Sequence, residues 1–480
     1  MLIQLFSNFN KFLKLFVVNK QLLRKKFILK RKNILFLQFR INCFVGTKLY
    51  YNMKKKHLII YIFIFLLCSI FSNNYALATL YTDSVFDKNI KTVQFYNSEN
   101  VLSYPILQLN TNTSLTLAFD YLIANKEVPD LSYKIFHCNY NWQLSNLYSN
   151  EYITGFEEND IYTVTNSFNT FCNYTHFSCI LPNENISIIY PGNYIIQVYN
   201  SGNDNQIVLT KRFYVAENKT DIEVNCIEPQ NVENKRTGQQ INFSIANTHI
   251  SNINQGNIAV QILQNGTPVY AQNVLKPSFI DNGHIYYNNQ EMNVFKGENE
   301  FYIIDTKNVK FAGLLVDSVS FIAPFYHFFG TPLEENKYKL YKFRQDFNGK
   351  YFIKSDKAFD LNTETDYAWV YFNVKHYNMD VEGDLYIFGE LTNWKLAPEN
   401  KLVYNFNTGL YTTKLFLKQG LYNFALVFVN KKSGAIDKSY LEGSHYETEN
   451  DYHILIYELK PGNSGDKIIG YKHFNTQKKL

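Results

Sequence analysis

Alternating apolar and polar residues in the C-terminal part of the chain predict short β-strands. The run 384–394 (DLYIFGELTNW) alternates and ends at Trp394, as expected for a strand that turns at the rim of a β-sandwich. The segment 407–429 holds two alternating runs that meet at residues 418–420, which predicts a hairpin. Residues 442–458 form a dense polar segment that leads into a further alternating strand. We therefore expect a compact immunoglobulin-like domain here.

The same alternation continues through the preceding part of the chain and predicts an all-β fold. Between residues 79 and 217, several alternating runs lie about ten residues apart, the spacing of strands in a sandwich. The polar segment 200–205 suits a hairpin tip, and Asn265-Gly266 is the strongest short hairpin motif of the middle region. We predict tandem immunoglobulin-like β-sandwich domains. They are expected at 79–217, 218–362 and 363–480.

The N-terminal region has the pattern of a secretory signal peptide, Met53–Ala78. A charged start at 53–56 precedes the apolar run 58–71, and Ala76-Leu77-Ala78 is a small-x-small cleavage site. The apolar run is short for a membrane span of roughly 20 residues, so an uncleaved anchor helix is the weaker alternative. A signal peptide acts from the N-terminus, so we interpret residues 1–52 as an erroneous extension. The mature protein is then expected in the periplasm without a membrane span.

The net charge changes once this region is set aside. Of the 47 basic residues, fourteen lie in residues 1–78, which contain no Asp or Glu. The rest of the chain has 33 basic and 42 acidic residues, a net charge of about −9. An acidic chain of this kind does not present the basic surface that nucleic-acid binding requires. Aromatic residues make up 17% of the chain, which favours packed β structure over disorder.

Four cysteines remain after the leader: Cys138, Cys172, Cys179 and Cys226. In an oxidising compartment they permit up to two disulfide bonds. Cys172 and Cys179 could close a hairpin, and the alternative is four buried free thiols. The chain has no Cys-x-x-Cys pair, so a zinc or redox site is not indicated.

No residue pattern predicts catalysis. His137 and Cys138 are neighbours in a predicted strand and would point to opposite faces, so they do not form a nucleophile and base. The chain has no G-x-S-x-G motif, no H-E-x-x-H motif and no phosphate-binding glycine loop. We therefore predict a non-enzymatic protein without a cofactor or a metal site.

Two features could instead bind a ligand. In an extended segment His445, Glu447, Glu449 and Asp451 would share one face, which could bind a divalent cation or form a solvated or internally hydrogen-bonded loop. Trp394 could stack on a sugar ring or cover the end of a sandwich. The runs around residues 384–394 and 421–429 resemble the early-set sandwiches appended to starch- and glycogen-acting enzymes, so the alternative function is periplasmic glycan binding.

Several stretches together resemble one specific family, the type IX secretion system plug proteins of Bacteroidota. The resemblance covers essentially the whole mature chain, whereas residues 1–52, Cys172 and Cys179 lie outside the pattern. It is carried by residues 90–109, 133–156, 167–183, 192–199, 209–215 and 437–458.

This resemblance implies a periplasmic protein that closes the periplasmic end of a very large outer-membrane translocon barrel. Such obstruction needs area and shape complementarity more than chemistry, which suits a stack of sandwiches. Reversible binding favours a polar, loop-borne contact surface, and we place part of it, or else a fold-stabilising network, in the polar segment. The residues concerned are Glu442, His445, Tyr446, Glu447, Glu449 and Asp451.

Overall fold

The computed structural model describes residues 82–477 except 124–126, 247–256, 268–271, 274–275, 282, 290–291 and 377–381. The expected signal peptide Met53–Ala78 and the extension 1–52 lie outside the described residues. The described chain consists of strands with a few short helical turns, which confirms the predicted all-β sandwich fold. Within it no helix is long and apolar enough to cross a membrane.

The first sandwich packs a four-stranded sheet against strands of a larger sheet. The smaller sheet has the order β2-β4-β9-β8. Its strands are β2 (Ile90–Asn97), β4 (Leu115–Leu122), β8 (Thr163–Asn166) and β9 (Tyr174–Leu181). The strands opposite are β1 (Ser84–Val85), β3 (Ile106–Gln108), β5 (Leu131–Cys138), β7 (Glu158–Asp160), β11 (Gly192–Asn200) and β12 (Asn203–Ala216). At one end lie helix α4 (Ser149–Tyr152) and the pair β6 (Ile153–Gly155) and β10 (Ile186–Ile188).

Alternation explains the core of this sandwich. Phe119, Phe177 and Phe213 come from three different strands and are at most 1% exposed. The predicted hairpin at 200–205 is confirmed, because β11 and β12 pair antiparallel up to Asn200 opposite Asn203.

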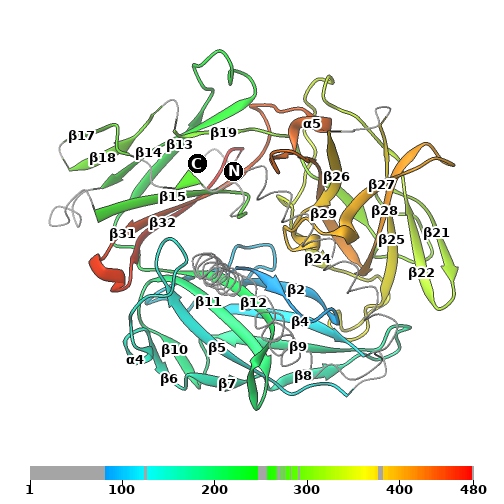
Figure 1. Cartoon of the computed structure of the whole chain (residues 1–480), viewed down its shortest axis with the longest axis horizontal. Helices are drawn as coiled ribbons and strands as arrows, with labels where there is room; N and C mark the ends of the chain where they lie inside the picture. Colours follow the sequence, from blue (N-terminus) through cyan, green and yellow to red (C-terminus); the bar gives the residue numbers. More distant parts are fainter. Residues whose placement is uncertain are drawn as a thin grey trace, which may run out of the picture. The chain divides into compact units, whose positions relative to one another are not determined.

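The middle sandwich is completed by the last strands of the chain. One of its sheets contains β13 (Ile222–Ile227), β14 (Gly238–Ala246), β17 (Phe279–Asp281), β18 (His284–Tyr287) and β19 (Val294–Lys296). The other contains β15 (Ile258–Gln264), β16 (Gln272–Asn273), β31 (Asp451–Glu458) and β32 (Lys467–Asn475). Figure 1 shows β31 and β32, in red, beside β15, in green. Strands β31 and β15 thus pair across the domain boundary expected at residue 363.

Two further contacts define this region. The Asn265-Gly266 turn has positive φ at both residues, as a tight turn requires. Strands β15 and β16 pair antiparallel, with Ile262 opposite Gln272, so the predicted hairpin forms with a connection longer than these two residues. Strand β32 also pairs parallel with β12 through Ile468 and Ala216. Within the described residues, the first and middle sandwiches therefore share one 10-stranded sheet.

The third sandwich is an 11-stranded sheet in which β27 pairs with both halves, so that the sheet folds over its own core. Its first strands are β20 (Tyr302–Asp305), β21 (Val316–Ile322), β22 (Phe325–Gly330), β23 (Leu333–Glu334), β24 (Tyr351–Ile353) and β25 (Tyr367–Lys375). The others are β26 (Gly383–Phe388), β27 (Lys401–Asn405), β28 (Leu410–Lys418), β29 (Gly420–Asn430) and β30 (Ile436–Asp437). Short helical turns are η4 (Glu390–Thr392), η5 (Pro398–Asn400), α5 (Ser439–Glu442) and, between β31 and β32, η6 (Pro461–Asn463).

The predicted hairpin at 418–420 is wrong. Strand β28 pairs with β25 and β27, whereas β29 pairs with β20, β24, β26 and β30, so the chain crosses from one half of the sheet to the other at this point. The side chain of Lys418 is buried against Asp120 of the first sandwich, and the Gln419 amide donates to the carbonyl of Thr306. These long-range bonds fix the crossing, and alternation along the sequence does not reveal them.

Candidate functional site

The polar segment 442–451, between α5 and β31, packs against residues 297–300 through backbone contacts. The His445 amide and the Thr448 hydroxyl both donate to the Glu298 carbonyl, each at 2.9 Å. A Cβ atom on Gly297 would lie 1.9 Å from the His445 carbonyl oxygen, so the two backbones touch only because Gly297 has no side chain. The segment is therefore an integral part of the fold.

Most polar side chains of this segment have partners inside the protein. Glu442 is 4% exposed and accepts hydrogen bonds from the Tyr302 hydroxyl and the Asn336 amide. Burial raises the pKa of Glu442. Asp451 accepts from the Asn348 amide at 3.0 Å and from His473 at 2.8 Å. Burial raises the pKa of Asp451, but the hydrogen bond from His473, the charges of His453 and His473 and the bond from Asn475 together lower it to about 2.

The remaining residues of the predicted partner surface differ in exposure. His445 and Tyr446 are half-buried, and the His445 ring packs on Tyr341 with centroids 5.6 Å apart. Glu447 is exposed, whereas Glu449 is half-buried. The geometry thus corresponds to an internally hydrogen-bonded loop with one exposed carboxylate. Its role as a partner surface stays a prediction.

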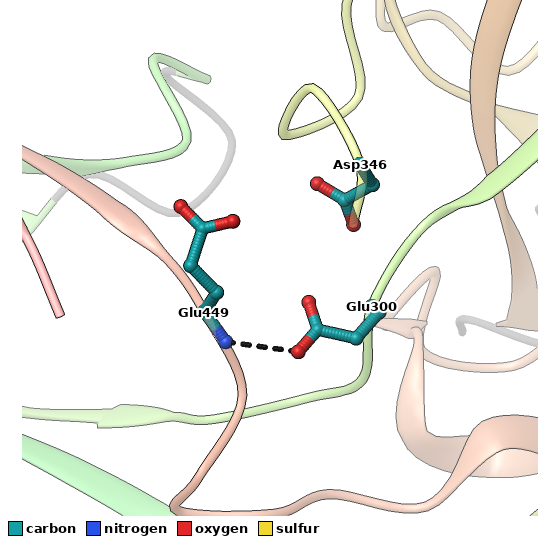
Figure 2. A group of neighbouring side chains, drawn as sticks. All are labelled: Glu300, Asp346 and Glu449. Atoms are coloured by element: carbon teal, nitrogen blue, oxygen red, sulfur yellow. Dashed lines mark hydrogen bonds between the residues drawn. The ribbon is translucent and has the colours of Figure 1, made fainter. Parts of the chain in front are cut away.

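Glu449 belongs to a carboxylate cluster that sequence reasoning missed. One carboxylate oxygen each of Glu300, Asp346 and Glu449 lies within 4.8 Å of the others. Glu300 precedes β20, Asp346 lies in the loop before β24, and Glu449 precedes β31, and Figure 2 shows their three carboxylates around a common space. Glu300 and Asp346 are 2% and 8% exposed. They are far apart in sequence and belong to no spacing motif, so only the fold brings them together.

An aromatic patch at the protein surface joins the first and third sandwiches. We define it as Phe171, which precedes β9, with Phe321 and Tyr326 of the β21–β22 hairpin. The Phe171 and Phe321 rings lie 5.1 Å apart and the Phe321 and Tyr326 rings 5.0 Å apart. Phe171 is 55% exposed and Phe321 49% exposed, although each contacts another ring. Asp366 holds the loop in place by accepting from the Phe171 amide at 2.8 Å. An exposed aromatic cluster of this kind is typical of a protein contact surface.

Trp394 is partly buried and packs edge-on against two rings. Its ring centroid lies 5.3 Å from that of Phe388 and 6.2 Å from that of Phe301, and its edge lies over Gly349. This packing matches a tryptophan that covers the end of a sandwich. Glycan stacking on Trp394 stays a prediction that no contact in the described residues favours.

All four cysteines of the described chain are free thiols, so the Cys172–Cys179 disulfide bond that the sequence left open is not formed. Strand β9 is extended from Tyr174 onward, and five residues of strand span about 16 Å. A disulfide needs Cα atoms within about 7 Å. Burial raises the pKa of each of the four thiols to about 12. His137 and Cys138 lie in β5 with 2% and 0% exposure, which leaves them inaccessible to a substrate.

We expect thiol titration to give four free thiols in the mature chain when it is denatured without reductant. The native protein should react far more slowly, because burial keeps the thiols protonated and covered. Alkylation followed by intact-mass measurement tests this, with a pre-reduced sample as the control. Two additional labels in the pre-reduced sample would reveal a disulfide and contradict the structure.

The described residues thus form three packed β-sandwiches. Residues 90–217 match a family model described as the first domain of the type 9 secretion system plug protein. A crystal structure of a hypothetical protein from Parabacteroides merdae ATCC 43184 is 30% identical, with a TM-score of 0.77 over 82% of this chain and 99% of that chain. A comparison with curated proteins gives no match. This chain belongs to the type IX secretion system plug protein family. Its role is therefore related to type IX secretion.

Proposed function

We propose that this protein is a non-enzymatic periplasmic plug that binds and closes the periplasmic end of the type IX outer-membrane translocon barrel. The match of residues 90–217 to the plug-protein model is the observation that carries this proposal. Export through the signal peptide Met53–Ala78 is part of the proposal, and sequencing the N-terminus of the mature protein tests it. A mature chain that starts at Thr79 is the expected result.

The contacts among the three sandwiches support a plug that resists deformation. The first and middle sandwiches share a sheet, and Lys418 of the third sandwich forms a buried ion pair with Asp120 of the first at 2.8 Å. The third and middle sandwiches also meet just before the polar segment, where Glu298 accepts from the buried Lys438 ammonium at 2.7 Å. A body held at each junction by buried polar bonds can block a pore without any reaction.

The aromatic patch is the contact surface that we propose for the barrel. Its rings come from two sandwiches and are half-exposed, whereas most side chains of the polar segment are already bonded inside the protein. Aromatic residues are enriched at protein interfaces, and a small patch is compatible with reversible binding. The exposed Glu447 is the one residue of the polar segment that remains fully available to a partner.

Affinity purification with crosslinking from the native host tests the function and the surface separately. The wild-type protein should recover an outer-membrane barrel, and Phe321→Asp should reduce recovery by about tenfold, as loss of an interface aromatic does. Phe406→Asp is the matched control, because Phe406 is 77% exposed and lies at the β27–β28 turn, outside the patch. Failure of the wild type to recover any barrel would refute the proposed function. Equal recovery by Phe321→Asp and the control would refute only the patch.

A further inference from the structure

The carboxylate cluster of Glu300, Asp346 and Glu449 contains more negative charge than its surroundings balance. Tyr341 donates its hydroxyl proton to one Glu300 oxygen, and the Glu449 amide donates to the same oxygen at 3.1 Å. Arg344 lies nearby, but its guanidinium donates to the Glu300 carbonyl at 3.0 Å and stacks over the Tyr302 ring.

Two buried oxygens beside the cluster have no hydrogen-bond partner among the described residues. The first is Oε2 of Glu300, on a side chain that is 2% exposed. In Figure 2 the Glu300 oxygen that takes no dashed bond points into the space between Asp346 and Glu449. The second is Oδ1 of Asn348, on a side chain that is 6% exposed. The unpaired oxygens indicate a missing partner, because a buried acceptor without one costs about 1–3 kcal/mol.

Asn348 contacts two members of the cluster directly. Its backbone amide donates to Asp346 at 2.8 Å, and its side-chain nitrogen donates to Glu449 at 3.2 Å. The same side-chain nitrogen also donates to Asp451 at 3.0 Å. Three carboxylates form an all-oxygen donor set, which calcium prefers over softer metals.

We propose that Glu300, Asp346 and Glu449 form a calcium-binding site. Oxygens bound to one calcium ion at about 2.4 Å lie at most about 4.8 Å apart, which fits the spacing of the three carboxylates. The unpaired Glu300 oxygen gains the partner that it lacks, and two positive charges offset the excess of carboxylates. Water completes the six to eight ligands typical of calcium.

The position of this site gives the ion a structural role. Glu300 and Asp346 belong to segments that enter the third sandwich through β20 and β24, whereas Glu449 leads into β31 of the middle sandwich. A bound calcium ion therefore links the two sandwiches at their junction. It also fixes the start of β31, the strand at the centre of the second sheet of the middle sandwich.

Calorimetric titration of the mature chain with calcium chloride, after removal of metals by a chelator, tests the site. We expect one calcium ion per chain and a rise in Tm of several degrees on calcium addition, because a ligand that binds only the folded state stabilises it. Asp346→Asn and the milder Glu449→Gln should each weaken binding at least tenfold. Terbium luminescence sensitised by the neighbouring Tyr341, and its displacement by calcium, gives a second readout.

Glu442→Gln is the matched control. Glu442 is a buried carboxylate of the same region whose bonds go to Tyr302 and Asn336, outside the cluster, so calcium binding by this variant should equal that of the wild type. Absence of calcium binding by the wild type, or binding that survives in both cluster variants, would overturn the proposal. Magnesium bound as tightly as calcium would overturn the choice of ion. The outcome is independent of the barrel partner, because binding is measured on the isolated chain.

Discussion

Replacing Asp120 with alanine should lower the free energy of unfolding by about 3–5 kcal/mol, because it leaves a buried lysine without its counter-charge. Asp120 and Lys418 are 1% and 2% exposed, and their charged atoms lie 2.8 Å apart. The same carboxylate accepts from His176 at 2.7 Å and from the Tyr367 hydroxyl at 2.8 Å. Alanine therefore removes an acceptor from three donors that water cannot reach, at the junction of the first and third sandwiches.

The loss should depend on pH in a direction that identifies Lys418 as its cause. Burial lowers the pKa of Lys418, and Asp120 is the main group that opposes this shift. In Asp120→Ala the Lys418 amine therefore binds its proton more weakly in the folded protein than in the unfolded chain. The loss of unfolding free energy is largest below the pKa of Lys418 in the folded protein and decreases as the pH rises through that pKa. It should therefore be smaller at about pH 9 than at about pH 7.

Chemical denaturation of the variants measures both effects. Glu158→Ala is the control, because the Lys134–Glu158 pair has a carboxylate that is 62% exposed, and loss of such a pair costs at most about 1 kcal/mol. Adding Lys418→Met to Asp120→Ala should recover part of the lost stability, since the unpaired charge is then absent. Equal effects of Asp120→Ala and Glu158→Ala would show that the buried pair does not hold the sandwiches together.

The strands were predictable from sequence because the pattern of apolar residues in each strand reflects which of its side chains are buried. Alternation in the run that begins at residue 384 follows from one face of β26 lying against a core, whereas the strands at 115–122 and 192–200 are largely buried on both faces. Hairpins with a tight polar turn, at 200–205 and at Asn265-Gly266, were predictable for the same local reason. Sequence patterns do not predict strand pairing that depends on distant residues. The 418–420 crossing is decided by Asp120, about 300 positions earlier in the chain.

The candidate sites show the same division between local and distant information. The polar segment 442–451 stands out in the sequence, but its partners at Gly297, Glu298 and Tyr302 do not, so its internal bonding was only one of two alternatives. Glu300 and Asp346 lie in ordinary loop sequence and carry no motif. The family resemblance was recognisable because it depends on long matching stretches and needs no knowledge of contacts.

Ending the chain at Asn450 should abolish folding of the middle sandwich. This truncation removes β31, which lies between β15 and β32, and removes β32 itself. Each of the lost core side chains contributes about 1.5–3 kcal/mol when buried, and together they match or exceed the total stability of a typical domain, about 5–15 kcal/mol. The side chains that are lost and at most 4% exposed are Tyr452, Ile454, Leu455, Ile456, Tyr457, Ile468 and Ile469.

Limited proteolysis with mass spectrometry reads this out region by region. In the chain that ends at Asn450, residues 222–296 should become rapidly cleaved, because β15 has lost its partner and the sheet opposite has lost its core. A chain that ends at Gln477 keeps both strands and serves as the control.

A separate fragment 363–480 should also fail to fold, since β31 pairs with β15 and β29 pairs with β20, and neither partner is in the fragment. A stable, protease-resistant fragment 363–480 would support the domain boundary expected from sequence instead, because only a domain with its own complete core folds alone.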